Sequence, residues 1–256
     1  MKSKRILEVE KYIKKNETVS IEELQDHFNV SINTIRRDIN ALAEKNSVKK
    51  VYGGVKSINN SNQKALDYSE RNVSNYKQKK EIGKLASTFI EQNDIIYIDT
   101  GTTTIHILDN IDENLTFTLI TNSLDIINKA TRFKNVTIFI IGEKYAPRTR
   151  SFTGIKSQSI IEKFNIKKAF MSATGINIKN GLSNAELEEN LIKQTVIRQS
   201  ETKYALTDHS KIGKATLLTY AQLNELDYLI TDQLPESSIQ EYCQKHYIDI
   251  INPQVG

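Results

Sequence analysis

Cysteine, proline and tryptophan are scarce in this sequence, whose 256 residues include one Cys, three Pro and no Trp. The single cysteine, Cys243, excludes an intrachain disulfide framework and any zinc site built from several cysteines. The longest uncharged apolar runs, such as residues 136–142, fall far short of the roughly 20 residues that cross a bilayer. The first residues, Met-Lys-Ser-Lys-Arg, lack the apolar core of a signal peptide. These absences predict a cytoplasmic protein that makes no contact with a membrane.

Charge is distributed unevenly along the chain. Of its 35 Lys and Arg and 31 Asp and Glu, residues 1–60 hold 12 and 8, so the whole net charge of +4 lies in the first quarter of the chain. A small basic segment beside a larger neutral one is typical of a protein whose first part meets nucleic acid. The same charge also fits a merely solvated surface, so the motifs have to decide.

The start of the chain shows three apolar runs at helical spacing. The first covers residues 6–13, and the second follows Ser20 and Glu23, which form a capping-box pattern for a helix start. The third follows Ser31, another N-cap candidate, and leaves Arg36 and Arg37 outside its apolar stripe. Two short helices joined by a tight turn are typical of a helix-turn-helix, whose second helix contacts base edges in the major groove.

The next segment, residues 47–56, predicts two short strands joined by a turn at Gly53 and Gly54, with Lys49, Lys50 and Lys56 displayed. A basic hairpin that follows a recognition helix is a wing. Each part has an ordinary alternative, because adjacent arginines are more often a solvated pair and two glycines alone are only a turn. Their order along the chain favours a winged DNA-binding domain.

This region resembles the DeoR family of bacterial transcriptional regulators. The resemblance runs through residues 30–39, Leu42 and residues 52–55, and the chain departs from the family at Tyr52, where His is usual. The resemblance implies that polar and basic side chains of the second helix contact DNA and that the glycine pair shapes the wing. Together with the lysines displayed by the hairpin, the candidate DNA-binding residues are Ser31, Asn33, Thr34, Arg36, Arg37, Lys49, Lys50, Tyr52, Gly53 and Gly54.

A polar stretch at residues 57–63 breaks the apolar periodicity and marks the start of a linker. The sequence thus predicts a winged helix-turn-helix domain at residues 1–57, a linker at 58–75 and a larger domain at 76–256. In the larger domain, helical patterns such as 123–131 and 186–200 alternate with strand candidates at 95–98, 117–120, 136–141, 168–171, 204–206 and 228–230. That alternation predicts an α/β fold with a mostly parallel sheet and helices on both faces.

Polar residues follow four of these strands, at 99–104, 121–123, 173–176 and 207–211. In parallel sheets, ligands bind at the carboxyl edge, where strands end and helices begin. The first segment, Asp-Thr-Gly-Thr-Thr-Thr, offers N–H groups, hydroxyls and a helix dipole, which suit a phosphate. A Gly/Thr turn alone is a weak sign, but the four segments together supply hydroxyls, amides, two carboxylates and an ammonium. That inventory predicts a phosphorylated sugar as the ligand.

The larger domain resembles the DeoR-type sensor domain, which is similar in fold to ribose-5-phosphate isomerase. Matching segments include residues 99–103, 121–124, 151–154 and 208–213, together with Glu189 and Lys193. The resemblance implies that the Gly101 loop holds the phosphate of an effector and that residues at neighbouring strand ends face its sugar. The candidate effector-binding residues are Asp99, Gly101, Thr102, Thr103, Thr104, Asn122, Gly175 and Lys211.

The leading hypothesis is a transcriptional repressor of a carbohydrate-metabolism operon, which binds double-stranded operator DNA and a phosphorylated sugar effector and forms a dimer or tetramer. The alternative is a sugar-phosphate isomerase-like enzyme with an N-terminal appendage, with Asp99, Glu189 and Asp208 as candidate bases. No paired acidic motif favours an enzyme, and the four histidines lack metal-ligand spacing, so no catalytic residue, metal or cofactor is predicted. A DNA-architectural protein without a ligand would leave the strand-end clusters unexplained. The identity of the sugar, the operator and the direction of the effector's action stay open.

Overall fold

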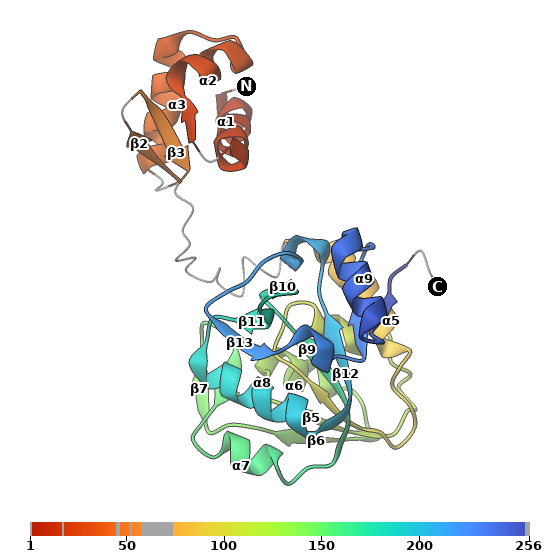
Figure 1. Cartoon of the computed structure of the whole chain (residues 1–256). Coiled ribbons are helices and arrows are strands. Elements are labelled where there is room, and N and C mark those ends of the chain that lie inside the picture. Colours follow the sequence, from red (N-terminus) through yellow and green to blue (C-terminus); the bar gives the residue numbers. More distant parts are fainter. Residues whose placement is uncertain (1, 17, 45–46, 52, 58–73, 254–256) are drawn as a thin grey trace. The chain divides into compact units, whose positions relative to one another are not determined.

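The computed structural model describes residues 2–16, 18–44, 47–51, 53–57 and 74–253. The chain divides into two compact units, Met1–Ala65 and Leu66–Gly256. Most of the predicted linker, residues 58–73, lies outside the described residues. Figure 1 shows a helical unit with a small sheet and a larger unit built on an extended sheet.

The first unit is a three-helix domain with a wing. Its buried side chains come from the apolar stripes of all three helices and from the sheet, and they form one core of Val9, Ile13, Val19, Leu24, Ile35, Ile39, Leu42, Val48 and Val55. Its three strands pair antiparallel in the order β1-β3-β2, so a third strand, β1, is paired with the predicted hairpin of β2 and β3. The elements are α1 Lys2–Asn16, β1 Thr18–Ser20, α2 Ile21–Phe28, α3 Ile32–Glu44, β2 Val48–Val51 and β3 Gly54–Ser57.

The tight turn between α2 and α3 is set by two short-range features. Ser20 caps α2, because its hydroxyl accepts a hydrogen bond from the Glu23 N–H at 3.0 Å. Asn29 ends the helix in the left-handed conformation with φ of 48°. The expected capping box is half formed, since the Glu23 carboxylate accepts from the Tyr12 hydroxyl at 3.1 Å and thus ties α2 to α1.

Replacing Ser20 with Ala is expected to lower the stability of the first unit by about 1 kcal/mol, because the Glu23 N–H loses its acceptor. Ser20→Asp should restore most of this loss, since a carboxylate caps equally well. Thermal unfolding followed by circular dichroism on the full chain measures both variants. Equal melting of Ser20→Ala and wild type would contradict this role of the cap.

The second unit is built on a seven-stranded sheet in which every neighbouring pair is parallel, in the order β15-β14-β12-β9-β4-β5-β6. The predicted α/β class and all six predicted strands are confirmed, and β15 was missed because its apolar run is very short. The strands are β4 Ile95–Ile98, β5 Phe117–Thr121, β6 Val136–Ile140, β9 Ile166–Ser172, β12 Ser200–Leu206, β14 Tyr228–Ile230 and β15 Asp249–Ile251.

Helices cover both faces of this sheet, as the alternation along the strands requires. In β4, Ile96 and Ile98 belong to the core under α5, η1 and α6, whereas Tyr97 belongs to the core under α7, α8 and α9. The helices are α5 Tyr76–Ser87, η1 Thr104–Asp109, α6 Leu124–Ala130, α7 Ser157–Ile161, α8 Leu187–Gln199, η2 His209–Lys211, η3 Leu223–Glu225 and α9 Ser237–Lys245. Within the described parts of the chain, no helix has the length and apolar character needed to span a membrane.

Two small antiparallel sheets lie beside the main one. The first joins β10 Gly175–Asn177, β11 Gly181–Asn184 and β13 Leu218–Ala221, and the second joins β7 Lys144–Ala146 and β8 Ser151–Thr153.

The order of the strands reverses between β4 and β9, the centre of the main sheet. From β4 the chain goes on to β5 and β6 on one side, and from β9 it goes on to β12, β14 and β15 on the other. The carboxyl ends of β4 and β9 therefore meet at a topological switch point, where sheets of this class bind ligands.

Candidate nucleic-acid interface and ligand pocket

One side of α3 carries exposed polar side chains. Asn33, Arg36 and Arg37 are exposed, whereas Ile35 and Ile39 lie in the core. Because a helix repeats every 3.6 residues, the exposed residues share a face that the core leaves free for a partner.

The start of α3 is fixed by its own polar side chains. The Ser31 hydroxyl accepts from the Thr34 N–H at 3.3 Å and lies 2.9 Å from the Thr34 hydroxyl. Asp38, by contrast, is buried and accepts two hydrogen bonds from the Arg5 guanidinium, at 2.8 and 3.2 Å. The Asp38 carboxylate is thus engaged inside the unit, and Arg36 and Arg37 place positive charge on the exposed face of α3.

The wing presents its lysines in a close pair. Lys49 and Lys56 are directly opposite each other in the β2–β3 register, and both are exposed, as is Lys50. Like charges opposite each other destabilise a sheet on their own, and a phosphate group relieves that repulsion. Lys56 was noted in the sequence but not included among the candidate residues.

Glycine is required at the two wing positions for different structural reasons. Gly53 has φ of +75°, a conformation that other residues rarely adopt. At Gly54 a Cβ would lie 2.5 Å from the Val19 carbonyl oxygen, so only glycine lets the wing pack against β1. Tyr52 lies outside the described residues.

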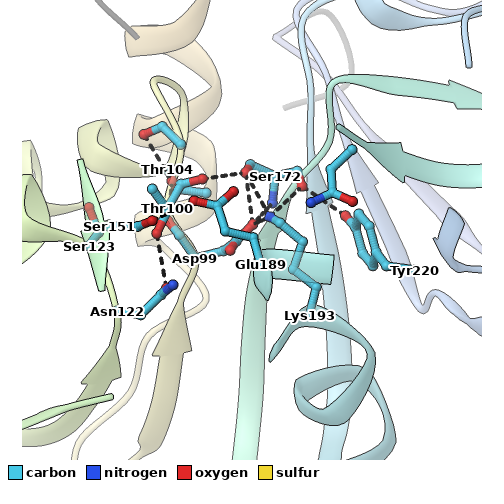
Figure 2. Close-up of polar contacts among 12 residues, drawn as sticks. Asp99, Thr100, Thr104, Asn122, Ser123, Ser151, Ser172, Glu189, Lys193 and Tyr220 are labelled. Atoms are coloured by element: carbon cyan, nitrogen blue, oxygen red, sulfur yellow. Dashed lines mark hydrogen bonds and ion pairs between the residues drawn. The ribbon is translucent and has the colours of Figure 1, made fainter. Parts of the chain in front are cut away.

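A polar pocket opens at the carboxyl ends of β4, β9 and β12, at the switch point of the sheet. Residues of α5, β11, α8 and η2 complete its wall, and Figure 2 shows several of them. Among its described lining residues, Ala173 is the single apolar side chain and no residue is aromatic. The lining consists of Lys79, Thr100, Gly101, Thr102, Thr103, Ser172, Ala173, Thr174, Asn184, Glu189, Lys193, Thr207, Asp208 and Lys211.

The loop after β4 is held in place by Thr104, which is fully buried. Its hydroxyl donates to the carbonyl oxygens of Asp99, at 2.7 Å, and Gly101, at 3.2 Å. Gly101 packs so closely that a Cβ there would lie 2.6 Å from the Ser172 Cβ. Thr102 and Thr103 both line the pocket, and their hydroxyls form no hydrogen bond with any described residue, so they are available to a ligand.

The segment that follows this loop differs from the sequence prediction. The loop continues into η1, a 3-10 helix of six residues, and not into an α-helix. A macrodipole grows with the number of aligned peptide units, so η1 offers little of the dipole that was expected to attract a phosphate. Hydroxyls and lysines must supply most of the attraction for an anion.

A buried ion pair joins α8 to the end of β4 at the pocket (Figure 2). The Lys193 ammonium on α8 pairs with the Asp99 carboxylate at the end of β4, with 3% and 1% of the side chains exposed. The same ammonium donates to the Ser172 carbonyl oxygen at 3.2 Å, and Asp99 Oδ2 accepts from the Ser172 N–H and hydroxyl, each at 2.8 Å. This network fixes β4, β9 and α8 relative to one another.

Asn122 and Gly175 also lie behind the pocket wall. Asn122 Oδ1 accepts from the hydroxyls of Tyr97, at 2.8 Å, and Thr100, at 2.9 Å, and its Nδ2 donates to the Phe152 carbonyl oxygen at 3.1 Å. At Gly175 a Cβ would lie 2.7 Å from the backbone oxygen of residue 214. Both residues shape the wall through packing and hydrogen bonds.

Two carboxylates face the pocket among the lysines. Glu189 is 8% exposed, and its Oε1 accepts from the Ser151 hydroxyl at 2.5 Å. For Asp208, burial opposes ionisation, but hydrogen bonds from Ser210 and Asn75 and the nearby charges of Lys211 and Lys79 outweigh it and lower its pKa. Asp208 is therefore ionised at neutral pH and accepts hydrogen bonds only.

The structure divides the eight predicted effector-binding residues into two groups. Gly101, Thr102, Thr103 and Lys211 line the pocket, whereas Asp99, Thr104, Asn122 and Gly175 stand behind it. Lys79 was not predicted; it lies in a lysine-rich segment at residues 77–80, yet only 2% of it is exposed. Glu189 and Lys193, spaced i and i+4 on one face of α8, were noted as matching the family but were not included among the candidate effector-binding residues.

The comparisons with known families cover both units. Residues 5–61 match the DeoR-like helix-turn-helix domain, and residues 74–233, more than half of the chain, match the DeoR C-terminal sensor domain. The chain belongs to the DeoR family. As a DeoR-family protein it is a DNA-binding transcriptional regulator, which confirms the family predicted from residues 30–39 and the glycine pair.

Individual relatives agree with this. The regulator is 46% identical to the HTH-type transcriptional regulator IolR of Bacillus subtilis over 250 residues, 98% of this chain and 99% of IolR. It is 29% identical to the lactose phosphotransferase system repressor of Staphylococcus aureus, over 98% and 99% of the two chains. Among solved structures, ribose 5-phosphate isomerase A of Methanocaldococcus jannaschii aligns with a TM-score of 0.41 and 16% identity, over 54% of this chain and 55% of the isomerase.

Proposed function

We propose that this DeoR-family regulator is a cytoplasmic repressor of a carbohydrate-metabolism operon and that a phosphorylated sugar bound in the pocket releases it from operator DNA. Residues 1–57 bind the DNA and residues 76–256 bind the effector. The observation that carries the proposal is a pocket at the sheet's switch point that combines free hydroxyls, lysines and two carboxylates. The repressor that is named as a relative, from a lactose phosphotransferase system, supports the carbohydrate role.

The phosphate of the effector binds at the loop after β4. Thr102 and Thr103 supply hydroxyl donors there, and Lys79 and Lys211 line the same pocket with positive charge. Hydrogen bonds from hydroxyls and ammonium groups to a phosphate are charge-assisted and strong, so they account for affinity.

The sugar part binds toward Glu189 and Asp208. Ionised carboxylates accept hydrogen bonds from the hydroxyls of a sugar, and the Asn184 amide beside them adds a polar surface. The described lining has no aromatic side chain on which a nucleobase would stack. The chemistry therefore favours a small polyol phosphate over a nucleotide.

We propose binding without turnover. An isomerase needs a base placed beside a C–H bond of the substrate. Each of the three candidate bases already accepts hydrogen bonds within the protein: Asp99 from Lys193 and Ser172, Asp208 from Asn75 and Ser210, and Glu189 from Ser151. Nuclear magnetic resonance of each bound sugar phosphate over hours tests this, and conversion at enzymatic rates would favour the isomerase-like alternative.

Thermal unfolding of the full chain with a panel of sugars tests the effector class. The panel contains glucose 6-phosphate, galactose 6-phosphate, fructose 1-phosphate and ribose 5-phosphate, the four free sugars and inorganic phosphate. A ligand at 100 times its dissociation constant stabilises the native state by about 2.7 kcal/mol, which is easily read. A shift with a sugar phosphate but not with its free sugar supports the proposal, and no shift with any phosphorylated compound contradicts it.

The DNA face of the proposal consists of α3 and the wing. Arg37→Ala is expected to weaken binding to a duplex selected by the wild type from a random pool by about 1–3 kcal/mol, because an arginine that reads a base edge contributes that much. Arg198→Ala, which removes the same charge from an exposed position in the second unit, is the control. Fluorescence anisotropy measures both, and equal affinities of the Arg37 variant and the control would remove Arg37 from the interface.

We further propose that the regulator acts as a dimer or tetramer. One winged unit presents a single α3 face and reads one half-site, whereas a two-fold pair reads two. Light scattering coupled to size-exclusion chromatography tests this at micromolar concentration with and without the duplex. A monomer under both conditions would contradict it.

A further inference from the structure

The described part of the second unit begins beside the pocket. Ser74 and Asn75 are its first residues, and α5 starts at Tyr76. Lys79 follows one turn later and lines the pocket with 2% of its surface exposed. A conformational change that is transmitted through the backbone from one unit to the other must therefore involve the start of α5.

Asn75 is tied directly to a pocket residue. Its Nδ2 donates to Asp208 Oδ1 at 2.8 Å and to the Ser210 hydroxyl at 3.1 Å. These bonds cross more than 130 positions of sequence, and Asn75 makes them from a left-handed conformation with φ of 52°. The Asn75 side chain forms no capping hydrogen bond to α5. Its described hydrogen bonds are instead to Asp208, the N-cap of η2, and to Ser210 within η2.

Asp208 is a pocket residue whose surroundings are sensitive to an added anion. It is a buried carboxylate on the wall of the pocket, and its nearby positive charges are Lys79 and Lys211, which line the same wall. A phosphate group drawn to these lysines competes with Asp208 for them and repels its carboxylate, because like charges are costly at short distance away from water.

We propose that Asn75 is the coupling residue of this regulator: its hydrogen bond to Asp208 anchors the start of α5 in the effector-free protein, and a phosphorylated sugar in the pocket breaks that bond. The proposal rests on the proposed function, because it needs an anionic effector at this site. Since coupling is reciprocal, loss of the bond both changes DNA affinity and makes effector binding easier.

Two variants of the full chain test the proposal. Asn75→Ala removes the donor, and Asn75→Asp keeps a residue that tolerates the left-handed conformation but places a second carboxylate against Asp208. Asn93 has φ of 65° and is exposed on the loop before β4, so Asn93→Ala and Asn93→Asp are matched controls for the strain of each substitution.

Binding of the panel's best sugar phosphate to Asn75→Ala is expected to be about three- to tenfold tighter than to wild type, the value of one hydrogen bond that no longer has to break. The added carboxylate of Asn75→Asp also repels a phosphate, so this variant is tested by duplex binding alone. Without any sugar, the affinity of both variants for the selected duplex should change in the direction that this sugar phosphate changes it in the wild type. The Asn93 variants should match the wild type in both measurements. A merely structural Asn75 would lower the melting temperature and leave both affinities unchanged, which would overturn the proposal.

The duplex measurement needs no effector, so the two proposals can fail separately. If no compound of the panel binds the wild type, the proposed effector class is wrong. In that case a changed duplex affinity of Asn75→Asp still supports the coupling role, and an affinity equal to that of Asn93→Asp overturns it.

Discussion

Lys193→Met is expected to destabilise the second unit by about 3–5 kcal/mol, although the two side chains have similar length and shape. The substitution leaves the Asp99 carboxylate 1% exposed without its ammonium partner. Breaking one side of a buried ion pair costs more than the pair itself contributes, because the remaining charge is neither solvated nor compensated. Thermal or urea unfolding of the full chain, followed on the second unit's transition, measures the loss.

Two further variants make this prediction specific. Lys214→Met removes a lysine from an exposed position and should change stability by a few tenths of a kcal/mol at most. In Lys193→Met/Asp99→Asn the stranded charge is gone, so the double variant should be more stable than Lys193→Met alone. A double variant less stable than Lys193→Met would show that Asp99 contributes through something other than this pair.

Thr102→Val is expected to weaken effector binding by about 1.5–3 kcal/mol, roughly ten- to 150-fold, and to leave folding and DNA binding unchanged. Valine keeps the volume and branching of threonine but lacks the hydroxyl, and this hydroxyl has no partner among the described residues that its loss would strand. The substitution should therefore lower the affinity for a ligand and leave the stability of the protein unchanged.

The control for this variant is Thr131→Val. The Thr131 hydroxyl donates to the Asn128 carbonyl oxygen at 2.7 Å on the surface of the second unit, away from the pocket wall. Isothermal titration with the best sugar phosphate of the panel measures both variants. Equal dissociation constants for Thr102→Val and wild type would remove Thr102 from the phosphate site.

The first unit was largely predictable because its signals are local. Ser20 and Ser31 mark helix starts, because each hydroxyl accepts from the N–H three residues later, and Gly53 marks a turn through its own backbone conformation. What could not be predicted was the use of Glu23, whose carboxylate bonds to Tyr12 on another helix. Whether the Glu23 carboxylate completes the capping box or bonds to Tyr12 depends on how α1 and α2 pack and not on the spacing of Ser20 and Glu23.

The position of the pocket at the edge of the sheet was predictable from the sequence, but the full set of residues that line it was not. The Thr102 loop follows a strand, and the general rule for parallel sheets puts it at a ligand-binding edge. The order of the strands in the sheet could not be predicted, and it is this order that makes β4 and β9 neighbours. The same order brings Asp99 to Lys193, which lies 94 positions away in the sequence. Asn122 looked like a ligand contact because it ends a strand, yet its polar atoms bind Tyr97, Thr100 and Phe152.

The most direct test of the account is a titration of the panel's best sugar phosphate into the full-length regulator bound to its selected, fluorescently labelled duplex. For the wild type we predict that anisotropy falls as the sugar phosphate saturates and that duplex affinity drops by about tenfold or more, within the usual range of allosteric coupling. Thr102→Val should bind the duplex normally and resist release, and the free sugar should have no effect. A sugar phosphate that binds the regulator tightly while duplex affinity stays constant would contradict the account, because the pocket would then have no control over DNA.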